Sequence, residues 1–142
     1  MTKISVPLPA NEELLPIARQ FDLRLIVLFG SVARGSANGE SDVDLGVLAS
    51  STLGENARLK LWSELSSLFS VDVDLTILNH ANPIVAYRVA CEGKILFENA
   101  PSDWEMWKSY VVRHYWDTAK FRDGLNNYLA RRVEGMRHVI AE

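Results

Sequence analysis

Four aspartates in two short segments are the residues of this chain best suited to chemistry. Asp42 and Asp44 lie two positions apart, and Asp72 and Asp74 repeat that spacing further along. Side chains at positions i and i+2 of a strand point to the same face, so each pair would place two carboxylates side by side. Like charges that close repel each other, and a fold tolerates them where a cation bridges them or water reaches them.

If the two acidic segments form neighbouring strands, one aspartate of the second pair joins the first pair in a single cleft. Three carboxylates together suit Mg²⁺ or Mn²⁺, which prefer oxygen ligands. The alternative interpretation is that Asp42 and Asp44 are solvated positions of an edge strand, because an isolated Asp-x-Asp pattern is common by chance. The segment that precedes this pair favours the metal site.

That preceding segment is an apolar run, 23–29, which leads directly into Gly30 and Ser31. A run this short and apolar predicts a strand that is buried on both faces. Glycine lets the backbone approach a ligand closely, and N–H groups at the start of a helix attract phosphate. Carboxylates for a cation and a turn for phosphates therefore predict a site for a nucleoside triphosphate.

The stretch LFGSVARGSANGESDVDLGVL resembles the signature of the polymerase-β-like nucleotidyltransferases, Gly-Ser, ten residues, Asp-x-Asp. The resemblance covers roughly residues 23–97 and continues more weakly in YWDTAKFRDGLNNYLARRV. The size of the chain and its C-terminal region are most similar to the minimal nucleotidyltransferases (MNT proteins). Members of that family are antitoxins encoded beside HEPN-domain toxins.

The resemblance implies which residues bind the nucleotide. Gly30 and Ser31 would hold the β- and γ-phosphates of ATP, and Arg34 and Ser41 also match common positions of the family pattern. The guanidinium fork of Arg34 suits phosphate oxygens, and the alternative is an exposed loop arginine. Ser41 has the alternative role of a turn former that steadies the start of the acidic strand.

The resemblance also assigns the metal-binding and catalytic carboxylates. Asp42 and Asp44 would coordinate two Mg²⁺ ions, with Mn²⁺ as a substitute, and one of these ions would be bound to the triphosphate. Asp74 would ligate the other ion and help to activate the incoming hydroxyl group. Asp72 is the rival for this third position, since the two aspartates share one segment.

The activity that the resemblance implies is transfer of AMP from ATP to a tyrosine hydroxyl of the HEPN toxin, whose ribonuclease activity is thereby blocked. The partners would be ATP and a toxin encoded by an adjacent gene, in a hetero-oligomer. One alternative is a non-catalytic antitoxin that blocks the toxin by complex formation, with an aromatic C-terminal helix as its binding surface. Another is a nucleotidyltransferase that acts on a small-molecule hydroxyl.

The elements that must position these residues follow from the punctuation of the chain. The pattern predicts an α/β (α+β) fold, a small mixed β-sheet flanked by helices, with the polymerase-β-like nucleotidyltransferase architecture and C-terminal helices. A single domain of residues 1–142 would comprise a core of about 10–98 and a C-terminal helical region of about 102–140. The expected helices are 11–20, 55–69, 83–92 and the C-terminal region with an interruption at Gly124; the expected strands are 23–29, 42–49, 71–78 and an edge strand at 94–98.

Two helices carry specific expectations about burial. In the helix 55–69, the spacing predicts a buried face; its members would be Leu59, Trp62, Leu65 and Phe69. Cys91 is expected to be a small core residue. In the C-terminal region, the expected packing face comprises Trp104, Trp107, Val111 and Tyr115.

Composition narrows the class of protein. The chain of 142 residues has 48% hydrophobic residues, and its 15 basic and 18 acidic side chains give a formal net charge of −3. That balance argues against a cationic nucleic-acid binder, so no direct contact with nucleic acid is expected. A single cysteine excludes an intrachain disulfide and a cysteine-rich zinc site. We expect a cytoplasmic protein without a signal peptide or a membrane-spanning helix.

Overall fold

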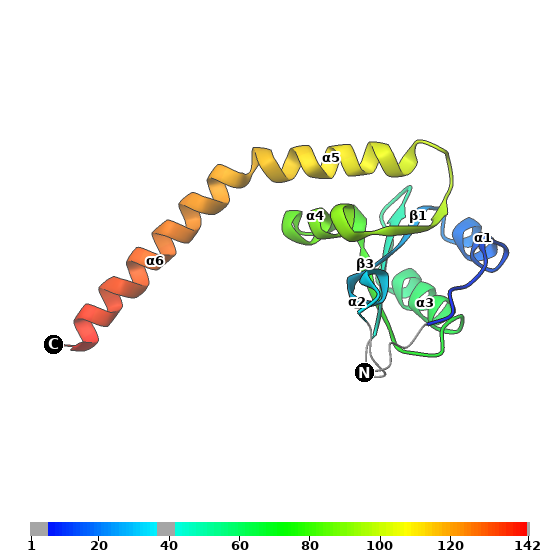
Figure 1. The fold of residues 1–142 in the computed structure, drawn as a ribbon, viewed down its shortest axis with the longest axis horizontal. Helices are drawn as coiled ribbons and strands as arrows, with labels where there is room; N and C mark the ends of the chain where they lie inside the picture. The colour runs from blue at the N-terminus through cyan, green and yellow to red at the C-terminus, as the bar shows by residue number, and fades with distance from the viewer. Residues whose placement is uncertain (1–5, 37–41, 142) are drawn as a thin grey trace.

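The computed structural model describes residues 6–36 and 42–141, with side chains described up to residue 137 (Figure 1). The elements are α1 (Asn11–Gln20), β1 (Leu23–Phe29), α2 (Gly30–Arg34), β2 (Val43–Ala49), α3 (Glu55–Ser66), β3 (Val73–Ile77), the 3₁₀ turn η1 (Leu78–His80), α4 (Pro83–Glu92), β4 (Lys94–Glu98), α5 (Asp103–Asp117) and α6 (Ala119–Ala141). The predicted order of helices and strands is therefore confirmed.

The four strands form one mixed sheet in the order β3-β2-β1-β4. β1 runs antiparallel to both of its neighbours, β2 and β4. β2 and β3 are parallel, so both acidic strands enter the sheet from the same end. This is the small mixed sheet with flanking helices that the sequence predicts, including β4 at one edge.

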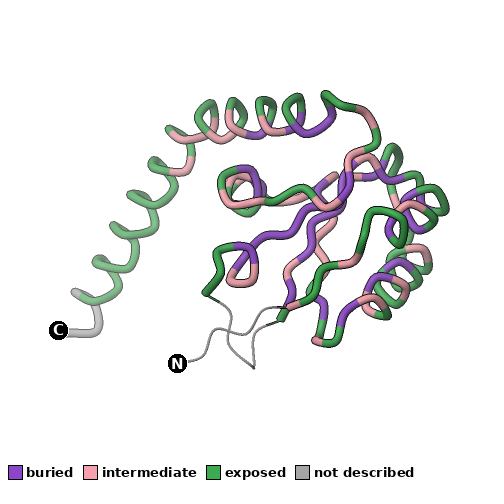
Figure 2. Tube along the Cα trace, turned by 45° about the vertical axis from the view of Figure 1, so that its right-hand side comes forward, coloured by how far each residue is buried: buried purple, intermediate pink, exposed green. Residues whose placement is uncertain are grey.

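Helices cover the sheet on both faces. On one face, Leu14 of α1 and Leu61 and Leu65 of α3 belong to a core that also contains inward residues of β1 and β2. On the other face, Val89 of α4 and Trp107 of α5 pack on the alternate residues of β1. β1 is consequently almost fully buried, which explains its continuous apolar sequence, and Figure 2 shows the buried strands between helices whose outer sides are exposed.

An ion pair ties α5 to β1, one of the two inner strands of the sheet. The Arg24 guanidinium donates a hydrogen bond of 2.7 Å to the Asp103 carboxylate, which is only 5% exposed. The backbone N–H of Ala100 donates to the same carboxylate at 2.9 Å. These two donors, chiefly Arg24, hold the pKa of Asp103 below its usual value despite its burial.

The C-terminal helices change direction at Thr118, where α5 ends, and not at the predicted Gly124, which lies inside α6. The Thr118 hydroxyl donates to the carbonyls of His114 at 2.9 Å and Tyr115 at 3.1 Å, which competes with regular helical hydrogen bonds. Arg122 lies over the Tyr115 ring and donates to its carbonyl at 2.9 Å. α6 then projects away from the sheet, as Figure 1 shows.

One expectation about burial was wrong in part and another was wrong. Of the face predicted for the helix 55–69, Leu65 and Phe69 are buried, whereas Leu59 is 66% exposed and Trp62 is 46% exposed. Leu61 is buried instead, and α3 itself ends at Ser66. Apolar residues occur on more than one face of this helix, so the spacing alone did not select the buried side. Cys91 is exposed, because the buried positions of α4 are Ala86, Val89 and Ala90 and position 91 lies beyond that stripe.

None of the helices in the described part of the chain is long and apolar enough to span a membrane.

Candidate active site

The register of the sheet brings two of the predicted carboxylates together. Asp44 of β2 is paired directly with Asp74 of the parallel strand β3, and on its other side it is paired with Phe29, the last residue of β1. Paired residues of adjacent strands point to the same face, so Asp44 and Asp74 project beside each other, on the side covered by α4 and α5. The condition that the sequence left open, that the two acidic strands are neighbours, is met.

The other two aspartates lie just outside these strands, and both are exposed. Asp42 precedes β2, and Asp72 precedes β3. The Asp72 carbonyl accepts the Val43 N–H at 2.9 Å and starts the parallel pairing. Position 74, not 72, therefore lies opposite Asp44, and the predicted Ser41 lies outside the described residues.

The turn at Gly30 is shaped around Asp44. Gly30 is buried and has a φ of +76°, a backbone conformation that favours glycine. A Cβ at this position would lie 2.9 Å from Cγ of Asp44, 3.2 Å from its Cβ and closer still to one carboxylate oxygen. The side chain of Asp44 thus rests directly on the backbone of the Gly30–Ser31 turn. The turn predicted to bind phosphate and the carboxylate predicted to bind a metal ion therefore contact each other in the folded chain.

Electrostatic repulsion is built into this cluster. Burial raises the pKa of Asp44 above its usual value, and the nearby carboxylates of Asp74 and Asp42 raise it further. The positive charges of Arg88 and Arg34 act in the opposite direction on the same pKa. Asp44 is therefore a carboxylate whose charged form gains from a nearby cation.

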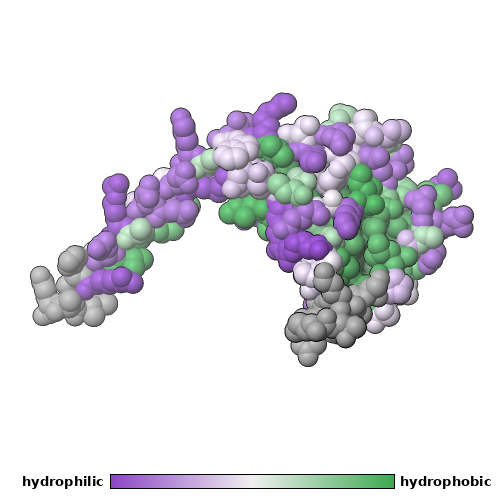
Figure 3. Space-filling model, viewed as in Figure 1, coloured by the Kyte–Doolittle hydropathy of each residue, from purple (hydrophilic) through white to green (hydrophobic). Residues whose placement is uncertain are grey.

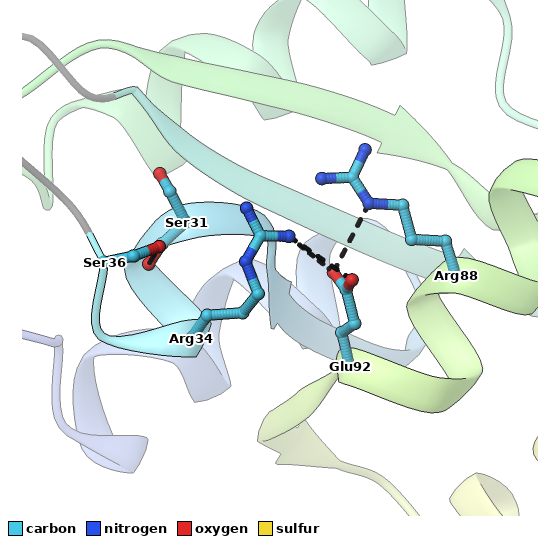
Figure 4. A network of polar contacts seen from close by, with 5 residues as sticks. All are labelled: Ser31, Arg34, Ser36, Arg88 and Glu92. Atoms are coloured by element: carbon cyan, nitrogen blue, oxygen red, sulfur yellow. Dashed lines mark hydrogen bonds and ion pairs between the residues drawn. The ribbon is translucent and has the colours of Figure 1, made fainter.

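Arg34 is paired with a carboxylate that sequence reasoning missed. Its guanidinium donates to both oxygens of Glu92 on α4, at 3.1 and 3.3 Å, and Arg88 donates to Glu92 at 3.3 Å through Nε (Figure 4). Arg88 and Glu92 are four positions apart on α4, so they face the same side of that helix. This spacing was the only signal in the sequence, and nothing in it indicated that α4 packs beside the Gly30–Ser31 turn.

The donor chemistry of the cluster fits a magnesium ion that is shared with a substrate. Within residues 6–36 and 42–137, no three His, Cys, Asp or Glu side chains are grouped closely enough to enclose an ion by themselves. Mg²⁺ is commonly held by one or two carboxylates together with substrate phosphates and water, not by a closed protein cage. Asp44, with Asp74 beside it and Asp42 close by, supplies oxygen donors of that kind.

A groove runs along β3, the edge strand that carries Asp74. Its volume is about 490 Å³, and it lies between α3 and the outer edge of β3. The residues that line it include Arg58, Leu59, Trp62, Val73, Asp74 and Leu75. The Trp62 indole N–H donates to the Val73 carbonyl at 2.8 Å, which fixes one wall of the groove. Exposed apolar side chains of α3 thus line a groove along the edge strand that carries Asp74.

Residues 12–102 match the family model described as polymerase beta, nucleotidyltransferase. The matched segment contains all four strands and both acidic segments. The chain belongs to this nucleotidyltransferase family.

Within the family, the chain is similar to two proteins called protein adenylyltransferase MntA. The one from Shewanella oneidensis is 40% identical over 81 residues, which cover 57% of this chain and 58% of that relative, less than two thirds of its length. The one from Aphanizomenon flos-aquae is 27% identical over 123 residues, which cover 77% of this chain and 82% of the relative.

Solved structures support the same relationship. A crystal structure of a toxin–antitoxin with AMP-PNP has a TM-score of 0.71 and 30% sequence identity, and it covers 84% of this chain and 98% of that one. A structure of a tri-AMPylated Shewanella oneidensis HEPN toxin in complex with MNT antitoxin has a TM-score of 0.65 and 28% identity, with 84% of this chain and 95% of that chain covered.

Proposed function

We propose that this protein is an antitoxin that transfers AMP from ATP to a tyrosine hydroxyl of a cognate HEPN ribonuclease toxin and thereby neutralises it. The toxin would be the product of an adjacent gene, and the two proteins would form a hetero-oligomer in the cytoplasm, where ATP is available. The observation that carries the proposal is the seating of Asp44 against Gly30, with Asp74 paired beside it across the two parallel strands. The similarity to adenylyltransferases and toxin–antitoxin structures supports the choice of substrates.

We assign ATP binding to one side of Asp44 and acceptor binding to the other. On the side of α2, Gly30, Ser31 and Arg34 would bind the phosphates of ATP, with Ser41 as a further predicted contact. The acceptor oxygen forms a bond to the α-phosphorus, and the bond from that phosphorus to the α–β bridging oxygen breaks. The bridging oxygen leaves with the electron pair on pyrophosphate, and the acceptor proton passes to water.

The carboxylates Asp42, Asp44 and Asp74 would hold Mg²⁺, or Mn²⁺ in its place. The ions would neutralise the charge that develops on the oxygens around phosphorus. Repulsion among these aspartates supports this role, because a cation relieves it. Pairing with Asp44 supports Asp74 over Asp72 as the third ligand.

Acceptor binding is assigned to the other side of Asp44. Asp74 is among the residues that line the groove between α3 and β3, so a segment of the toxin that lies in it would pass along the strand that carries this aspartate. Its exposed side chains Leu59 and Trp62 would contact apolar groups that flank the acceptor tyrosine.

A second candidate function is neutralisation by binding alone. One side of α6 carries exposed apolar residues at helical spacing; they are Phe121, Leu125, Tyr128, Leu129, Val133 and Met136. Figure 3 shows apolar side chains along the side of α6 that is turned toward the rest of the molecule. A surface of this kind suits a tight protein complex, whether or not transfer also occurs. A small-molecule acceptor is the remaining alternative.

The deciding experiment is the intact mass of the adjacent gene's product after co-expression with this protein. We expect additions of whole AMP units with the unaltered protein and none with the Asp42→Asn/Asp44→Asn variant. Asp74→Asn should also abolish the additions, whereas the matched control Asp72→Asn should retain them. An unmodified toxin that is bound and inactive with the unaltered protein would refute transfer and favour the binding candidate. An unmodified, unbound and active toxin would refute both and direct the search to small-molecule acceptors.

A further inference from the structure

Two guanidinium groups meet at one carboxylate beside the candidate active site. Arg34 is the last residue of α2, the short helix that begins with Gly30 and Ser31, and Arg88 comes from α4, which contacts α2 (Figure 4). Both donate to Glu92, at 3.1 Å and 3.3 Å to the same oxygen, Oε2. One negative charge is therefore shared by two positive charges, and the cluster keeps a net charge of +1.

The two arginines keep unused donors. A guanidinium group has five N–H donors, and Glu92 accepts from only one nitrogen of each arginine. Among the described residues, neither terminal nitrogen of Arg88 has a hydrogen-bond partner. Figure 4 shows the terminal nitrogens of Arg88 and the second one of Arg34 turned away from Glu92. Both side chains are accessible, with 44% of Arg34 and 51% of Arg88 exposed.

This arrangement differs from an ordinary surface ion pair in its position and charge. An isolated Arg–Glu pair on a helix is electrically neutral and contributes little to stability. Here a surplus positive charge lies next to a cluster of carboxylates that would hold metal ions, at the side of the turn expected to bind phosphates. A ligand that satisfies both clusters carries several negative charges and coordinates a cation, as the β- and γ-phosphates of a Mg²⁺-bound nucleotide do.

We propose that Arg34 and Arg88 together bind the β- and γ-phosphates of ATP, and the pyrophosphate formed on transfer, and that Glu92 positions both guanidinium groups. This inference rests on the proposed function and adds Arg88 and Glu92 to its site. As the α–β bond breaks, negative charge grows on the bridging oxygen and pyrophosphate. Fixed guanidinium groups stabilise that charge without having to reorganise. Glu92 keeps each arginine from extending into solvent, since a long side chain otherwise samples many rotamers.

Direct binding measurements separate this role from catalysis. The probes are ATP, AMP and inorganic pyrophosphate, each with Mg²⁺, titrated into the purified chain by calorimetry. We expect Arg88→Gln to weaken ATP and pyrophosphate binding by about ten- to a hundredfold, the usual effect of losing charge-assisted hydrogen bonds, and AMP binding by less than about threefold. Arg88→Lys should recover part of the loss. The control Arg19→Gln removes one exposed positive charge from α1, on the opposite face of the sheet, and should leave all three affinities unchanged.

The variant Glu92→Gln tests the positioning role. It makes the cluster more positive, so a purely electrostatic role predicts tighter ATP binding, whereas a positioning role predicts weaker binding of ATP and pyrophosphate with AMP unaffected. An equal loss for all three ligands together with a lower melting temperature would mean that Glu92 is merely structural, and would overturn its part of the proposal. If the unaltered protein binds ATP and Arg88→Gln binds it equally well, the arginine site is refuted while the proposed function stands. If the unaltered protein binds no ATP, the proposed function itself fails.

Discussion

Replacement of Gly30 by alanine tests the central contact of the site. Gly30 and Gly35 have nearly the same backbone conformation, with φ of +76° and +72°. An alanine at either position costs about 1–2 kcal/mol, because a Cβ disfavours the left-handed region. For a chain of 142 residues, this corresponds to a decrease in melting temperature of roughly 3–8 °C.

The two positions differ in what the added methyl group would meet. At Gly35 no atom of the described residues lies within 4 Å of the place that the methyl carbon would take, so the backbone strain is the whole cost. At Gly30 the methyl group would overlap the Asp44 carboxylate, with Cγ only 2.9 Å away. Asp44 must then move by about the radius of an atom, and a displacement of ~1 Å in a catalytic group costs on the order of a hundredfold in rate.

We therefore expect Gly30→Ala to lower the rate of AMP transfer by about a hundredfold or more, and Gly35→Ala to stay within a few-fold of the unaltered rate. The two variants should have similar melting temperatures. The assay is transfer of radiolabelled AMP to the purified toxin, with melting temperatures measured on the same samples. A folded Gly30→Ala variant with the unaltered rate would refute the reasoning. Equal losses in the two glycine variants would show that backbone strain, not displacement of Asp44, limits the rate.

Three further outcomes follow from the described contacts. Asp44→Asn should raise the melting temperature at pH 7 in metal-free buffer. The pKa of Asp44 is raised, chiefly by burial and then by Asp74, so the folded state disfavours the charged carboxylate that the amide replaces. The gain should vanish as the pH falls below the pKa of the unfolded state, about 3.9. Arg24→Gln should lower the free energy of unfolding by about 1–2 kcal/mol. Because Arg24 lowers the pKa of Asp103, this loss is present above pH ~4 and shrinks as the pH falls through the pKa of the folded state. Denaturant unfolding curves measured at a series of acidic pH values would show it. Leu59→Glu should raise the KM for the toxin by about three- to tenfold and leave ATP affinity unchanged, and a raised KM for ATP would argue against an acceptor groove.

Strands were predictable from the sequence because each has an unambiguous pattern. The run 23–29 is apolar on both faces since helices cover both sides of β1. The two acidic segments alternate, and their aspartates interrupt strands that are otherwise apolar. Each of these patterns lies within a short stretch of the chain, so the strands could be located without knowing which elements pack on them.

Helix faces were predicted less well, because burial depends on what packs against each side. In α3, apolar residues occur on more than one face, and the edge position of β3 leaves Leu59 and Trp62 beside a groove instead of under the sheet. The short stripe of α4 has room for Ala86, Val89 and Ala90 but not for Cys91. A pattern of apolar spacing does not contain this information.

The candidate site was predictable only where its members are close in sequence. The Gly-Ser turn and the two acidic pairs were found from their spacing, but the choice of Asp74 over Asp72 as the neighbour of Asp44 needed the strand register. The pair Arg88 and Glu92 lies more than fifty residues from Arg34, and no local signal connects them. Their role depends on how α4 packs on α2, which only the folded chain displays.

The exposed helix α6 should be less protected from hydrogen exchange and proteolysis than the sheet and the helices that cover it. Its 23 residues extend roughly 35 Å, and every side chain described between Asp123 and Arg137 is exposed. Beyond Arg122 the helix is exposed on all sides and depends mainly on its own propensity, so its amide hydrogens should exchange with deuterium far faster than those of β1. Proteases should cut there first. Protection of α6 against exchange would thus report occupation of this surface by a partner, independently of any chemistry at the carboxylates.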